Sequence, residues 1–124
     1  MRSILILVLS FSTHIASAHG GGHEPAVGPL VGEVIDLTCY ASHAGEGAKH
    51  AKCALDCIKK GNPVAILSKG LLYAVISSDH ESPNTKLAPF AGKQVVVTGE
   101  QSEKAGMHFI DLQTVVEQPA VKKP

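Results

Sequence analysis

The sequence has no tryptophan, few other aromatic residues and no excess of charge of either sign. Aromatic residues make up 4% of the 124 positions, and 11 basic side chains balance 11 acidic ones. Proteins that bind nucleic acid typically carry a basic surface and aromatic stacking platforms. The composition therefore predicts no nucleic-acid partner. A chain of this length also builds only one modest core, which excludes a large multidomain enzyme.

No apolar run is long enough to predict a membrane span, but the first residues have the pattern of an export signal. Arg2 gives a positive start, residues 4–9 are apolar, and Ala16-Ser17-Ala18 is a small-residue cleavage site. A membrane anchor needs about 18 continuous apolar residues, whereas this run is interrupted at Ser10. We predict a signal peptide over residues 1–18 and a periplasmic or secreted protein.

The rest of the chain alternates short apolar runs with polar turns. Residues 19–29 are rich in glycine, proline and histidine and predict a flexible tail, and residues 118–124 predict a second, disordered one. Residues 30–40 predict a strand that ends at the first cysteine, Cys39, followed by a loop over residues 41–47. Residues 48–60 predict a helix, because they are rich in helix formers and end in two lysines, a glycine and a proline.

Four more apolar segments complete the predicted domain, which spans residues 30–117. Residues 63–68 and 71–78 predict a hairpin, and residues 93–100 and 108–117 predict two further strands joined by a polar link over 101–106. A short helical turn is expected near residues 85–91. Five short strands favour a barrel over a sandwich. The predicted fold class is mainly β: a five-stranded barrel with one α-helix inserted between its first two strands.

Two segments of the chain have a recognisable pattern: LVGEVID over residues 30–36 and AGKQVVVTGE over residues 91–100. They resemble segments of small exported bacterial OB-fold domains, in which a strand of the pattern G-K-x-V-x-V-x-G precedes the closing strand. The resemblance implies an OB-like barrel in which the helix over residues 48–60 replaces a loop. It implies no function.

Three cysteines and one histidine form the most informative pattern in the chain. On a helix of 3.6 residues per turn, His50, Cys53 and Cys57 lie within a stripe about 60° wide. Cys39 precedes a glycine-containing loop that can bring it to the same place. Three thiolates and one imidazole are the ligands of a tetrahedral Zn(II) site or a Cu(I) site. We therefore predict Cys39, His50, Cys53 and Cys57 as metal ligands. The nearby lysines are expected to lower the thiol pKa values; they are Lys49, Lys52, Lys59 and Lys60.

Other interpretations of these residues stay open. A structural disulfide from Cys39 to Cys53 or Cys57 is ordinary in an exported protein, although it leaves one thiol unexplained. A bridge between Cys53 and Cys57 is disfavoured by their spacing on a helix. Thiol redox chemistry is disfavoured because no C-x-x-C motif is present. If cleavage follows Ala18, His19 and His23 are secondary candidates for Cu(II) binding.

The sequence thus favours an exported binding module, not an enzyme, that holds Zn(II) or Cu(I) for its own structure or for trafficking to another exported protein. The alternative is an OB-like interaction protein that is stapled by a disulfide and holds no metal.

Overall fold

The computed structural model describes residues 26–119. The predicted signal peptide, His19, His23 and the last five residues lie outside this range. The described elements, in chain order, are β1 (Ala26–Val27), β2 (Leu30–Asp36), α1 (Leu37–His43), α2 (Ala51–Lys59), β3 (Val64–Ser68), β4 (Leu71–Ile76), α3 (Asn84–Leu87), the 3-10 helix η1 (Ala88–Phe90), β5 (Gln94–Lys104) and β6 (Met107–Glu117).

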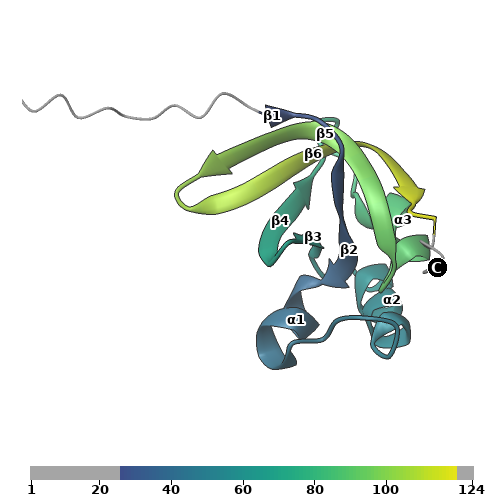
Figure 1. The fold of residues 1–124 in the computed structure, drawn as a ribbon. Coiled ribbons are helices and arrows are strands. Elements are labelled where there is room, and N and C mark those ends of the chain that lie inside the picture. The colour runs from purple at the N-terminus through teal and green to yellow at the C-terminus, as the bar shows by residue number, and fades with distance from the viewer. Residues whose placement is uncertain (1–25, 120–124) are drawn as a thin grey trace, which may run out of the picture.

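Five strands close into a barrel, as predicted (Figure 1). Strands β2, β3 and β4 form an antiparallel meander, β4 pairs in parallel with β6, and β5 pairs antiparallel with both β6 and β2. The pairing of β5 with both neighbours closes the ring, which leaves no barrel strand with an open edge. The two-residue strand β1 adds to β5 outside the ring and lies within the range where the sequence predicts a tail.

β-Branched side chains fill the interior of the barrel. Val34, Ile66, Val95 and Ile110, from four different strands, are fully buried. Along β5 and β6, buried residues such as Val95 and Ile110 alternate with more exposed ones, which is the pattern of a strand with one buried face. Ile58 on α2 joins the same core, so α2 is packed against the barrel.

The segment inserted between β2 and β3 differs from the prediction, because it contains two helices. The strand predicted over residues 30–40 ends at Asp36, and the next seven residues form α1. The apolar content of residues 37–40 suggested a continuing strand, but the Asp36 side chain accepts the backbone N–H of Cys39 and begins a helix there. Similarly, α2 begins at Ala51 instead of residue 48, so that His50 is its N-cap residue.

The polar link predicted over residues 101–106 is also wrong for most of its length. Strand β5 continues to Lys104 and pairs with β6 as far as Met107, which leaves only Ala105 and Gly106 in the turn. Polar side chains are compatible with a strand when cross-strand hydrogen bonds satisfy the backbone. The predicted hairpin and the short helical turn are confirmed by β3–β4 and by α3 with η1.

Helices α1 and α2 lie together at one end of the barrel, beyond the end of β2 (Figure 1). All the cysteines of the chain lie on these two helices. None of the helices within residues 26–119 combines the length and the apolar character that a bilayer span requires.

Candidate metal centre

Asp36 and Cys39 form the inner part of the site. Strand β2 carries Asp36 to the end of the barrel, where its side chain is fully buried. One carboxylate oxygen, Oδ1, accepts the backbone N–H of Cys39 over 2.6 Å. This N-cap fixes the first turn of α1 and so the position of the Cys39 thiol, which is buried at 9% exposure.

Helix α2 brings the other two thiols to Cys39. The Sγ atom of Cys39 lies 3.9 Å from that of Cys53 and 3.8 Å from that of Cys57, and all three cysteines are free thiols. Metal–sulfur bonds of about 2.3 Å in a tetrahedral Zn(II) site place neighbouring sulfurs about 3.8 Å apart. Both separations therefore match those of two thiolates on one ion.

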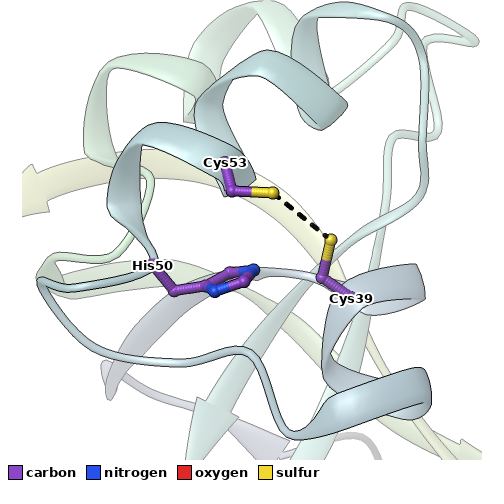
Figure 2. A group of neighbouring side chains, drawn as sticks. All are labelled: Cys39, His50 and Cys53. Carbon is purple, nitrogen blue, oxygen red and sulfur yellow. Dashed lines mark hydrogen bonds between the residues drawn. The ribbon is translucent and has the colours of Figure 1, made fainter.

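The imidazole of His50 points into the space beside Cys39 and Cys53 (Figure 2). Its Nε2 atom is buried and has no hydrogen-bond partner. Gly45 makes room for the ring, because a Cβ atom added there would lie 2.6 Å from Nε2. The ring of His43 is close by, with its centroid 5.0 Å from that of His50. The lack of a partner leaves Nε2 free to bind an ion.

The four predicted ligands, together with Asp36, fall into two groups that share Cys39. The ligand atoms of Cys39, His50 and Cys53 lie within 4.8 Å of one another, and so do those of Asp36, Cys39 and Cys57. The Cys/His cluster is thus close enough to hold a metal ion, but the four predicted ligands do not form one group at this distance. Sequence reasoning missed Asp36, although an aspartate three residues before Cys39 is the pattern of a helix N-cap.

The immediate surroundings of Cys39 favour the protonated thiol. The Asp36 carboxylate, followed by burial and by the neighbouring thiols, raises the pKa of Cys39 to about 12. The prediction that nearby lysines lower the thiol pKa is therefore wrong for this cysteine. One of those lysines, Lys52, instead pairs with the exposed Asp56 at 3.2 Å. An ion that binds Cys39 has to displace its proton, as thiolate coordination requires.

Two contacts hold the start of α2 against the barrel. The Glu33 carboxylate on β2, itself buried, accepts the backbone N–H of Gly47 in the loop between the two helices. Gly92, just before β5, packs so closely that a Cβ atom added there would lie 2.6 Å from the Cβ of Ala51. These contacts place His50 and the α2 cysteines relative to α1.

A pocket of about 400 Å³ lies elsewhere, between α1, the β3–β4 hairpin and the turn before β6. Its lining includes Tyr40, Leu71 and Met107 but none of the three cysteines. The thiol cluster is therefore separate from this pocket.

No protein-family model, curated protein or solved structure matches the chain. The resemblance to exported bacterial OB-fold domains thus stays a prediction beyond the closed barrel itself.

Proposed function

We propose that this protein is an exported, non-enzymatic binding module that holds Zn(II) or Cu(I) at its Cys/His cluster. The observation that carries the proposal is that the ligand atoms of Cys39, His50 and Cys53 lie within 4.8 Å of one another. Thiolate sulfur and imidazole nitrogen together favour Zn(II) and copper over hard cations such as Mg²⁺. Cys57 lies 3.8 Å from Cys39 on the other side of the cluster and extends this donor set.

The free nitrogen of His50 supports metal binding over a purely structural role for these residues. A buried polar atom without a partner costs about 1–3 kcal/mol, and a bound ion removes that cost at Nε2. An ion bound by Cys39 and His50 also links α1 to α2, since these residues belong to different helices. The exposed thiol of Cys53 gives the ion a route to solvent or to a partner protein.

A disulfide is the competing interpretation. To form one, Cys39 Sγ has to move from 3.8 Å to about 2.05 Å from Cys57 Sγ, or from 3.9 Å to about 2.05 Å from Cys53 Sγ. Such a bridge also leaves one thiol free and gives no role to the buried nitrogen of His50. The two interpretations predict different numbers of free thiols.

Elemental analysis combined with thiol counting distinguishes a metal site from a disulfide. Protein purified under metal-replete conditions without added reductant is expected to contain bound Zn or Cu, with three free thiols once the metal is removed. Cys53→Ser is expected to lower the metal content. His43→Ala is the matched control, because His43 is an exposed histidine beside the cluster but belongs to neither group. Metal-free protein with one free thiol and a disulfide would overturn the proposal.

The export part of the proposal is supported by the signal-peptide pattern of residues 1–18. Intact mass spectrometry of protein recovered from the periplasm or the medium is expected to show a chain that begins at His19. A chain that retains Met1 and stays in the cytoplasm would contradict export without affecting the metal site.

A further inference from the structure

We propose that the cluster is a two-ion centre in which the sulfur of Cys39 bridges two divalent thiophilic ions such as Zn(II). The outer ion is bound by Cys39, His50 and Cys53, and the inner ion by Asp36, Cys39 and Cys57. This inference rests on the proposed metal-binding function and goes beyond it by naming the number of ions, the bridging atom and a carboxylate ligand.

The positions of the three sulfur atoms fit two metal sites that share Cys39 Sγ as a ligand. Cys39 Sγ is almost equally distant from the other two sulfurs, at 3.9 Å from Cys53 and 3.8 Å from Cys57. Each separation matches one edge of about 3.8 Å in a tetrahedral thiolate site. However, Cys57 does not join the group that contains Cys53 and His50. One ion at the centre of all four predicted ligands thus fits less well than two ions on either side of Cys39.

The unpartnered polar atoms support the same division. Among residues 26–119, Asp36 Oδ2 and His50 Nε2 are the two buried side-chain atoms that have no hydrogen-bond partner. One belongs to each group of ligands. Native proteins rarely leave such atoms unsatisfied, and each one requires an explanation. An ion in each group explains both, whereas an ion in the His50 group alone leaves the fully buried Asp36 oxygen without a partner.

The charge of the ligands also favours two divalent ions. With three thiolates and the Asp36 carboxylate ionised, the ligands carry four negative charges, and Asp36 forms no ion pair within the described residues. One Zn(II) balances half of this charge, and two balance all of it. Uncompensated charge is costly where it is buried, as at Asp36 and Cys39, so two Zn(II) ions suit the cluster better than one. A pair of Cu(I) ions leaves half of the charge unbalanced.

The two positions differ in access to solvent. The outer ion has the exposed Cys53 as a ligand, whereas the inner ion is bound by the fully buried Asp36 and the half-buried Cys57. We therefore expect the outer ion to exchange with a chelator faster than the inner one. We therefore assign the inner ion a role in stabilising the α1–α2 segment and the outer ion a role in metal exchange with a partner.

Stoichiometry in ligand variants tests the two-ion centre. The reduced protein is titrated with Zn(II) against a chromophoric chelator, and the wild type is expected to hold two more ions than Cys39→Ser, the variant that loses the bridge. Asp36→Asn is expected to hold one ion fewer than the wild type. Asparagine keeps the N-cap of α1, so this variant tests the ligand without removing the cap.

The remaining variants check the assignment of each position. Cys57→Ser is expected to lose the slowly exchanging ion, and Cys53→Ser and His50→Ala the fast one, while His43→Ala keeps both. Cadmium NMR of the wild type, which needs no variant to fold, is expected to give two resonances of equal intensity. One resonance, or one bound ion that is unaffected by Asp36→Asn, would overturn the two-ion centre while leaving the proposed function intact. No metal in any variant would overturn both.

Discussion

The hydrogen bond from the backbone N–H of Cys39 to the Asp36 carboxylate, 2.6 Å long, both begins a helix and positions a thiol. Without this cap, the chain leaving β2 has no side chain to satisfy the first N–H groups of α1. The contact of the same carboxylate with the Cys39 side chain is the largest cause of the raised pKa of that thiol. The fold and the chemistry of the site are thus coupled through one side chain.

The three thiols are expected to react with an alkylating reagent in the order of their exposure. In the metal-free, reduced protein at pH 8, Cys53 is exposed and should react first, Cys57 second and the buried Cys39 last. The raised pKa of Cys39 lowers its thiolate fraction further, so we expect its rate to be at least about tenfold below that of Cys53. Peptide mass spectrometry over time gives the order, and an early reaction of Cys39 would contradict the placement of its thiol.

Gly45→Ala is expected to weaken metal binding without touching a ligand. The added Cβ would lie 2.6 Å from His50 Nε2 and so displaces the ring from the cluster. Changes beside a metal ligand typically cost about tenfold to a hundredfold in affinity, and we expect a loss in that range by Zn(II) competition. Gly28→Ala is the matched control, because a Cβ there meets nothing within 4 Å. Equal affinity in both variants would argue against His50 as a ligand.

Replacing Glu33 tests whether its contact with Gly47 holds the loop between α1 and α2 in place, without changing a thiol ligand. Glu33→Ala removes the acceptor of the Gly47 N–H, and hydrogen bonds to charged groups contribute about 1.5–3 kcal/mol. We expect a loss of that order in the free energy of unfolding, measured with urea, together with weaker Zn(II) binding because the start of α2 is released. Glu33→Gln keeps a side-chain acceptor and should retain most of both properties. Identical behaviour of the two variants would show that this contact does not hold the loop.

Asp79, which lies far from the cysteines in the sequence, should make folding depend on pH in the acid range. The hydroxyl of Ser77 and the backbone N–H of Glu81 donate to its carboxylate, and with help from Lys86 they lower its pKa. A pKa that is lower in the folded protein contributes stability above the unfolded pKa, near 4, and that stability is lost as pH falls through the folded value.

Urea unfolding of wild type and Asp79→Asn at several pH values tests this dependence. The stability advantage of the wild type over Asp79→Asn should shrink as the pH falls from about 5 to about 3. The subtraction removes the effect of the other carboxyl groups. A difference between the two proteins that stays constant over this range would contradict the effect of the Ser77 and Glu81 contacts.

Much of the fold follows from the sequence, because it depends on local patterns. The alternation in β5 and β6, the Lys69-Gly70 turn between β3 and β4, and the glycine and proline after α2 each specify an element through neighbouring residues. The choice of a barrel also follows from the number and length of the strands. The sequence also indicates the three cysteines and His50 as candidates, since an odd number of cysteines in a predicted exported protein leaves one that a disulfide within the chain does not pair.

Only the tertiary structure decided where β2 ends and which side chains share the site. Residues 37–40 suit a strand as well as a helix, and the choice depends on the Asp36 cap and on the packing of α1 beside α2 at the end of the barrel. The division of the ligands into two groups around Cys39, and the presence of Asp36 in one of them, depend on distances between residues as far apart in the sequence as Asp36 and Cys57. Spacing along one helix fixes the angles between its own side chains but carries no information about a neighbouring helix. The ligand group of Asp36, Cys39 and Cys57 therefore follows only from the tertiary structure.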